Sequence, residues 1–253
     1  MNNNNSVLVV GLGEIGRPLL QVLSKHHPTF GLDLEPVEDL PAEIDIMHIC
    51  YPFRIPNFLE ETAKYVEKFK PRVTVLNSTV AVGTTRELAT RCGVAVANSP
   101  VRGKHARMEA DLLHYDKFVG AIAPDTGEYV AKHFNDAGMQ TRVLSSPEAT
   151  ELAKLTETTY FGVMIAWAQE VERYCDDLGL DYDEVVSMYE EVPFFPPVKF
   201  FPGVIGGHCV MSNIEIMCES NRTEILAAIE ASNKQKIERE ERQSKADGEY
   251  SAA

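Results

Sequence analysis

The sequence predicts an α/β protein with a doubly wound parallel sheet, followed by a helical domain built on one long helix. Two observations predict this class. Short apolar runs alternate with helical patterns through residues 1–145, which is typical of a parallel sheet covered by helices on both faces. From Pro147 onward, apolar residues recur at steps of three or four, as they do in a helix. We therefore expect two domains, over residues 1–146 and 147–253.

The strands are expected where short runs of aliphatic and β-branched residues stand. These runs are Val7–Val10, Thr29–Leu32, Ile44–Cys50, Val73–Leu76, Val94–Ala97, Lys117–Ala121 and Gln140–Leu144. Helical patterns fall between most of them, at Glu14–Lys25, Asn57–Phe69, Gly83–Cys92 and Thr126–Ala137.

The long helix has recognisable ends. Ser146 is a good N-cap, Pro147 suits the first helical position, and Gly179 suits the position after the last turn. The helix between them has about thirty residues and is apolar on two sides, including Trp167. A helix that is apolar on two sides needs two partners, its own domain and a second copy of the chain.

The C-terminal part is predicted to be less regular. Asp181 with Glu184 resembles a capping box of a short helix. Residues 193–207 are too rich in Pro and Gly for regular structure, so a loop is expected there. Helices are expected over Ile214–Cys218 and Thr223–Glu238, and the polar residues 239–253 are expected to form a frayed, solvated tail.

Composition excludes several classes of function. The formal net charge of −14 disfavours nucleic acid and anionic membranes as partners. The five cysteines lie far apart without CxxC spacing, which argues against a disulfide framework and against a metal site, and fits a reducing compartment. The polar N-terminus lacks the features of a signal peptide, and no apolar run approaches the roughly 20 residues of a membrane span. A cytoplasmic protein is expected.

A glycine motif points to a dinucleotide. Gly11, Gly13 and Gly16 stand in GxGxxG spacing after the first strand, and Asp33 ends the second strand about twenty residues later. In a Rossmann-type domain these glycines permit a tight turn, close approach to a pyrophosphate and close helix packing, while the acid binds the ribose hydroxyls. The segment after Asp33 has no arginine to receive a 2′-phosphate, so NAD is expected rather than NADP.

Four segments resemble the UDP-glucose/GDP-mannose dehydrogenase family: VVGLGEIG, NSTVAVGTT (77–85), EATELAKLTETTY (148–160) and PGVIGGHC (202–209). The likeness runs from about Val7 to Met217. It implies an NAD-dependent dehydrogenase that acts on CH–OH groups, and in the family a sugar alcohol is oxidised to an acid in two hydride transfers. Family enzymes bind the sugar nucleotide with a further domain, which we do not expect within these 253 residues. The family also uses the long helix at its dimer core, which implies a homodimer through residues 147–178.

The resemblance assigns roles to individual residues. It implies that Cys209 attacks the aldehyde formed by the first oxidation, that Lys154 steadies developing oxyanions, and that Thr79 lies near the nicotinamide and the hydrolytic water. The remaining implied residues bind the cofactor (Gly11, Gly13, Glu14, Ile15, Gly16, Asp33, Ser78) or the small-molecule substrate (Arg102, Thr158, Gly206, Gly207, His208, Asn213).

Three positions depart from the family. Thr158 stands where the family has asparagine, Asn213 where it has an acid, and Val101 where it has the glutamate of a Ser-Pro-Glu motif. Positions that activate water, move protons and bind oxyanions are thus altered. The segment NSPVRG with a helix-borne lysine is also similar to the beta-hydroxyacid dehydrogenases, in which a single hydride transfer takes place and Lys154 would act as acid or base.

Other interpretations stay open. The chain can be an NAD-binding regulatory module, or a transferase that uses a nucleoside cofactor on the same fold. Cys209 can be a packing residue, and Lys154 a surface lysine. The basic cluster of Arg102, Lys104, His105 and Arg107 can be a solvated helix start or can capture an anionic substrate.

Overall fold

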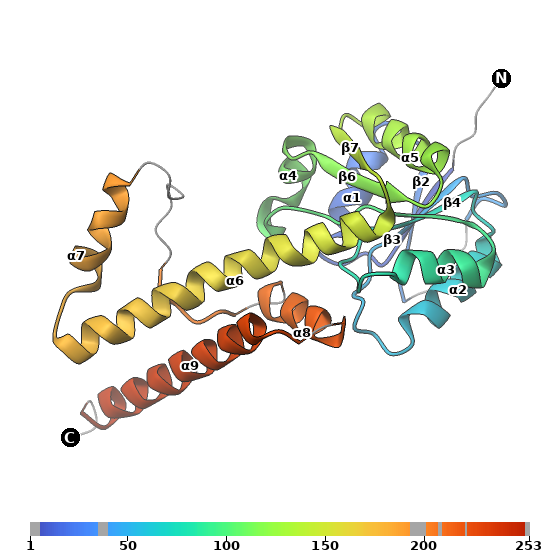
Figure 1. The fold of residues 1–253 in the computed structure, drawn as a ribbon. Helices are drawn as coiled ribbons and strands as arrows, with labels where there is room; N and C mark the ends of the chain where they lie inside the picture. The colour runs from blue at the N-terminus through green and yellow to red at the C-terminus, as the bar shows by residue number, and fades with distance from the viewer. Residues whose placement is uncertain (1–5, 35–39, 193–200, 207–208, 221, 251–253) are drawn as a thin grey trace. The chain divides into compact units, whose positions relative to one another are not determined.

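The computed structural model describes residues 6–34, 40–192, 201–206, 209–220 and 222–250. It divides into two compact units, Met1–Lys154 and Leu155–Ala253 (Figure 1). The division falls within helix α6 (Pro147–Leu178). The domain boundary expected at residue 146 stays a prediction.

The first unit is built on a sheet whose strand order is β2-β1-β3-β4-β5-β6-β7. The strands are β1 (Val7–Val10), β2 (Thr29–Leu32), β3 (Ile46–Ile49), β4 (Val73–Leu76), β5 (Ala95–Asn98), β6 (Lys117–Ala121) and β7 (Thr141–Leu144). Each lies within a residue or two of an expected strand, so the predicted α/β class with a Rossmann-type sheet is confirmed.

The predicted parallel sheet is mostly parallel, with an exception at one edge. Strand β6 runs antiparallel to β5, and β7 is parallel to β6. Residues 99–116, which connect β5 to β6, hold a turn of 3-10 helix (His105–Arg107) and the seven-residue helix α4 (Met108–His114).

Both faces of the sheet are covered. Along β1, Val7 and Val9 belong to one apolar core, while Leu8 and Val10 belong to another, as the two-residue period of a strand requires. The first core includes residues of α1 (Gly16–Leu23), α4 and α5 (Pro124–Asp136). The second includes residues of α2 (Phe58–Phe69) and α3 (Thr84–Cys92), which lie together in Figure 1. The sheet is therefore doubly wound, as expected.

Helix α6 has the predicted ends. Ser146 Oγ accepts a hydrogen bond from the Ala149 N–H at 3.2 Å, which makes Ser146 the N-cap. Gly179 has a φ of +69°, the left-handed conformation that commonly ends a helix. The Leu180 N–H then donates to the Cys175 carbonyl at 2.8 Å, which satisfies a carbonyl of the last turn.

The second unit adds further helices: α7 (Tyr182–Val186), a 3-10 turn (Ser187–Glu191), α8 (Val210–Ser220) and α9 (Glu224–Tyr250). Asp181 caps α7 by accepting from the Glu184 N–H at 2.9 Å, as expected. Residues 201–206 have no regular structure. The rest of the loop predicted over residues 193–207 lies outside the described residues.

Two helices are longer than expected. Helix α8 begins four residues earlier than predicted, and the prediction of a frayed tail is wrong for residues 239–250, because α9 continues through them. Charged side chains hold α9 to α6: Lys236 Nζ lies 2.8 Å from a Glu172 carboxylate oxygen, and Arg239 pairs with Asp176. A charged run therefore extends the helix here. Over the described residues, no helix combines the length and the apolar character that crossing a membrane requires.

Candidate functional site

The strand order places a topological switch point between β1 and β3. The chain passes from β1 to β2 on one side and then to β3 on the other. In open α/β sheets, ligands bind beyond the carboxyl ends of the strands at such a point. The segments that follow β1 and β3 meet there, since Gly11 lies against the backbone of Tyr51.

The three glycines have distinct local reasons. Gly11 has a φ of +87°, and a Cβ on it would lie 2.8 Å from the Tyr51 nitrogen. A Cβ on Gly16 would lie 1.8 Å from the Gly11 carbonyl oxygen, so only glycine lets α1 pack this closely on β1. A Cβ on Gly13 would meet no described atom within 4 Å. Gly13 therefore borders open space in front of the N-terminus of α1, where a phosphate is stabilised.

The other predicted cofactor residues surround this loop. Glu14 is exposed, and Ile15, which precedes α1, packs partly against the core of the first unit. Asp33 follows β2 and accepts hydrogen bonds from the Leu12 N–H at 3.1 Å and the Leu34 N–H at 3.0 Å. Its exposed carboxylate thus lies beside the glycine loop, at the place where a ribose hydroxyl is bound in dinucleotide sites. These residues fit a dinucleotide.

The segment between β4 and α3 is tied to the same edge of the sheet. Ser78 is buried and donates a hydrogen bond to the Tyr51 carbonyl oxygen at 2.5 Å, which joins the loops after β4 and β3. Thr79 follows and is half-buried. The structure therefore brings Gly11, Ser78 and Thr79 to one edge through their contacts with Tyr51 and along the chain.

Sequence reasoning missed Glu151, which is 1% exposed. Its carboxylate accepts from the Gly83 N–H at 2.7 Å, the Thr85 N–H at 2.9 Å and the Thr85 hydroxyl at 2.6 Å. Glu151 therefore caps α3 from α6, one turn before Lys154. Burial raises the pKa of this carboxyl, while the hydrogen bonds from Thr85 and Gly83 act in the opposite direction. In the sequence, the available sign of this buried acid was its place in the helical segment ELAKL (151–155).

Lys154 is half-buried on α6, and Thr158 follows one turn later on the same helix. Positions four apart on a helix share a face. Intermediate burial is compatible with both interpretations of Lys154, so its role stays a prediction. Lys154 belongs to the first unit and Thr158 to the second.

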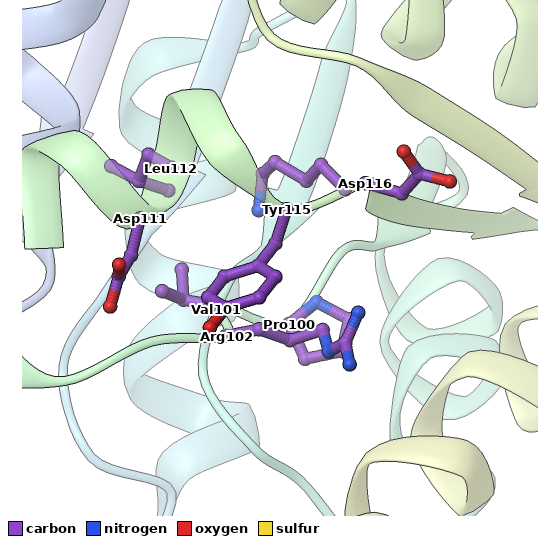
Figure 2. A pocket seen from close by; sticks show the side chains of 8 residues that line it. Pro100, Val101, Arg102, Asp111, Leu112, Tyr115 and Asp116 are labelled. Atoms are coloured by element: carbon purple, nitrogen blue, oxygen red, sulfur yellow. The ribbon is translucent and has the colours of Figure 1, made fainter.

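Arg102 lies beside a small pocket of the first unit (Figure 2). Its guanidinium stands 5.4 Å from the centre of the Tyr115 ring and 5.6 Å from that of Phe118. The preceding residue, Val101, is buried. Of the predicted basic cluster, Arg107 pairs with an acid, because its Nε lies 3.0 Å from an Asp111 oxygen; the backbone N–H of Lys104 also donates to the Asp111 carboxylate.

Lys117 is a second residue that the sequence did not single out. It is 4% exposed and lines the pocket beside Arg102. Its ammonium donates to the Ser99 carbonyl oxygen at 2.7 Å and lies 4.7 Å from the centre of the Phe134 ring. Burial lowers the pKa of Lys117 to about 7, and the nearby charge of Lys154 acts in the same direction. A lysine at the start of an apolar strand was its only sequence signal.

Two histidines form a buried polar chain in the same unit. His48 Nε2 lies 3.1 Å from His133 Nε2, and His48 Nδ1 lies 3.1 Å from the Asn77 amide nitrogen. Burial lowers the pKa of both imidazoles, that of His133 to about 3. Neutral rings therefore fill this space. In the part of the chain that the structure describes, no group of three or more potential ligands is arranged to hold a metal ion.

The remaining predicted residues belong to the second unit. Cys209 is exposed and stands directly before α8, and its carbonyl oxygen accepts from the Asn213 N–H at 3.2 Å. Asn213 is buried. Gly206 is exposed, whereas Gly207 and His208 lie outside the described residues. The packing interpretation of Cys209 is not supported, because its side chain is not in the core.

Comparison with known proteins gives a consistent picture. The model of the UDP-glucose/GDP-mannose dehydrogenase family, central domain, matches residues 148–235. A curated relative, the UDP-N-acetyl-D-mannosamine dehydrogenase of Campylobacter jejuni, is 25% identical over 83% of this chain. The alignment spans 66% of that relative, so this chain corresponds to about two thirds of its length.

Solved structures share the fold. The UDP-D-ManNAc dehydrogenase of Pyrococcus horikoshii has a TM-score of 0.78 at 18% identity. The match covers 91% of this chain and 68% of that enzyme. The 3-hydroxyisobutyrate dehydrogenase of Mycobacterium tuberculosis has a TM-score of 0.72 at 15% identity. The match covers 91% of this chain and 93% of that enzyme. The resemblance to the UDP-glucose/GDP-mannose dehydrogenases that the sequence motifs indicated is thus confirmed by the family model and by the curated relatives.

Proposed function

We propose that the chain is an NAD-dependent dehydrogenase that oxidises a CH–OH group of a sugar-like or other small substrate. The observation that carries the proposal is the glycine loop at the switch point, with open space at Gly13 and the Asp33 carboxylate beside it. NAD held there would accept the hydride. The names of the curated relatives, which are dehydrogenases of sugar nucleotides, support the same reaction class. Asp33 favours NAD, because its carboxylate would repel a 2′-phosphate.

Lys154 and Cys209 are proposed to carry the chemistry. The Lys154 ammonium would stabilise the oxyanion that develops as the alcohol is oxidised. For oxidation beyond the aldehyde, the Cys209 sulfur would attack the carbonyl carbon to give a thiohemiacetal, and loss of a second hydride would give a thioester that water hydrolyses. Thr79 would lie near the nicotinamide, and Thr158, Asn213 and the glycine segment before Cys209 would contact the substrate.

A second candidate is a single hydride transfer on a small hydroxy acid. Val101 favours it, because this position is apolar and buried where the family has a glutamate. Arg102 favours it too, since a guanidinium beside a pocket is suited to bind a carboxylate. In that reaction Lys154 would act as the acid or base, and Cys209 would have no chemical role.

The yield of NADH per substrate consumed distinguishes the two candidates. The purified chain is supplied with NAD and with a panel of UDP-sugars and small hydroxy acids. Two NADH per substrate indicate oxidation to the acid, and one indicates a single transfer. We expect Lys154→Ala to lower kcat by about 10²–10³-fold. We expect Cys209→Ser to reduce a yield of two to one, with Cys218→Ser as the control that leaves it unchanged.

Two results would contradict these assignments. An unchanged rate in Lys154→Ala would remove the lysine from the mechanism, and a yield of two NADH in Cys209→Ser would remove the thioester. If no NAD binds in a calorimetric titration at millimolar concentration, the dehydrogenase proposal itself fails.

The assembly and the compartment are also proposed. We infer a homodimer through helix α6 and a location in the cytoplasm. All five cysteines are unpaired thiols in the structure, which suits a reducing compartment. The support for the dimer is the aromatic stripe of α6, which is described in the Discussion.

A further inference from the structure

The segment that leads to Cys209 is held by a buried amide. Asn233, on α9, is 4% exposed. Its Oδ1 accepts from the Ile205 N–H at 2.7 Å, and its Nδ2 donates to the Ile205 carbonyl at 2.9 Å. Asn233 thus pairs with both backbone groups of one residue, as a neighbouring strand would. Ile205 is itself 3% exposed, so these groups need such partners.

A second amide holds the same segment from α6. Gln169 is fully buried, and its Nε2 donates to the Gly203 carbonyl oxygen at 2.7 Å. Ser232 orients it by donating its hydroxyl to Gln169 Oε1 at 2.8 Å. Two buried amides therefore bind the backbone of residues 203–205, and a buried hydroxyl supports one of them.

Asn233 also contacts the segment that follows Cys209. Its Nδ2 lies 3.8 Å from the sulfur of Met211, in the first turn of α8. Around it, Ile205, Val210, Ile214, Leu226 and Ile229 form a small apolar core. One side chain therefore touches both flanks of Cys209, four residues before it and two residues after it. The thiol itself is exposed, so its position depends on how these flanks are held.

We propose that Gln169, Ser232 and Asn233 form an amide clamp whose role is to position the Cys209 sulfur. The inference rests on the proposed function only in that Cys209 is the nucleophile. The three residues are positioning residues, because they act on the backbone of the loop. A core that needed only packing would gain nothing from buried amides, since each must find partners for all its polar atoms. Here those partners include the backbone carbonyl and N–H groups of residues 203–205.

The clamp can be tested by two measurements, neither of which requires a substrate. In Asn233→Ala we expect the Ile205 amide hydrogen to exchange at least tenfold faster, as followed by NMR, because its buried acceptor is gone. We also expect the alkylation of Cys209 by iodoacetamide at pH 7 to slow at least threefold. A loop that is no longer fixed holds the exposed sulfur in its reactive position for only part of the time.

The controls separate positioning from loss of fold. Lys234→Ala changes the next, exposed residue of α9 and should leave both rates unchanged. The buried Cys175 should stay unreactive in every variant; its labelling in Asn233→Ala would mean general unfolding. Should Asn233→Ala fail to fold, Gln169→Leu is the second variant: it removes the tie to Gly203 and the acceptor of the Ser232 hydroxyl but keeps Asn233. It is expected to change the same two rates in the same directions.

Each outcome decides the proposal. An unchanged Ile205 exchange rate in a folded variant would show that there is no clamp. Faster exchange with an unchanged or faster alkylation of Cys209 would show a clamp that does not position the sulfur. Absence of dehydrogenase activity in the unmodified chain would overturn the proposed function and leave both of these measurements valid.

Discussion

Lys117 places an ammonium group in the interior of the first unit. It donates a hydrogen bond to the Ser99 carbonyl and contacts the Phe134 ring, and burial lowers its pKa from 10.5 to about 7. Between these two pH values the unfolded chain binds more protons than the folded chain. The free energy of unfolding therefore rises as pH increases from about 7 to about 10.5, where the amine is neutral in both states.

We expect Lys117→Met to remove this part of the pH dependence. The unmodified chain should gain stability between pH 7 and pH 10 relative to the variant, and Lys117→Met should be the more stable of the two at pH 7 by about 1 kcal/mol or more. Urea unfolding at a series of pH values measures the difference. Lys132→Met, at an exposed site, is the control. A constant difference across this range would contradict the assignment.

Residue patterns predicted the elements of the first unit because most of its structural reasons are local. Apolar runs such as VLVV form buried strands, and Gly16 is required by its close approach to Gly11, five residues away. The direction of β6 shows only in its antiparallel pairing with β5, and the extension of α9 depended on its ion pairs with α6. The roles of Glu151 and Asn233 lie in pairings across 66–68 and 28 residues, which no short pattern contains.

The Glu151 cap is expected to contribute both to the free energy of unfolding and to the placement of Thr79. Glu151→Ala leaves two N–H groups at the start of α3 without their acceptor, so we expect a loss of about 2–4 kcal/mol at pH 7. Because α3 begins shortly after Thr79, NAD binding should weaken as well. Chemical unfolding and calorimetry measure the two effects.

Glu148 provides the matched control. It also joins α6 to α3, through Arg86, but this ion pair is largely exposed, with half of the arginine side chain in solvent. Glu148→Ala should therefore cost no more than about 1 kcal/mol. Equal losses from the two substitutions would mean that the buried cap contributes no more than a surface pair.

At the scale of the whole molecule, α6 presents an aromatic stripe. Tyr160, Trp167 and Tyr174 are 58%, 56% and 58% exposed and stand seven residues apart. Seven residues are close to two helical turns, so the three rings share one face over about 21 Å. Leu178, 71% exposed, continues the stripe at the end of the helix. Three large rings in water along one helix face are unusual for a monomer and typical of a contact between subunits.

The proposed homodimer follows from this stripe. We expect Trp167→Glu to weaken the dimer at least about 30-fold, since a central tryptophan of an interface commonly contributes 2 kcal/mol or more. Lys234→Glu places the same charge on an exposed position of α9 and should have no effect. Light scattering at micromolar concentration measures the mass, and the fluorescence of Trp167, the single tryptophan of the chain, reports its burial directly. If the unmodified chain is a monomer with a solvent-exposed tryptophan spectrum at these concentrations, the stripe faces something other than a second copy.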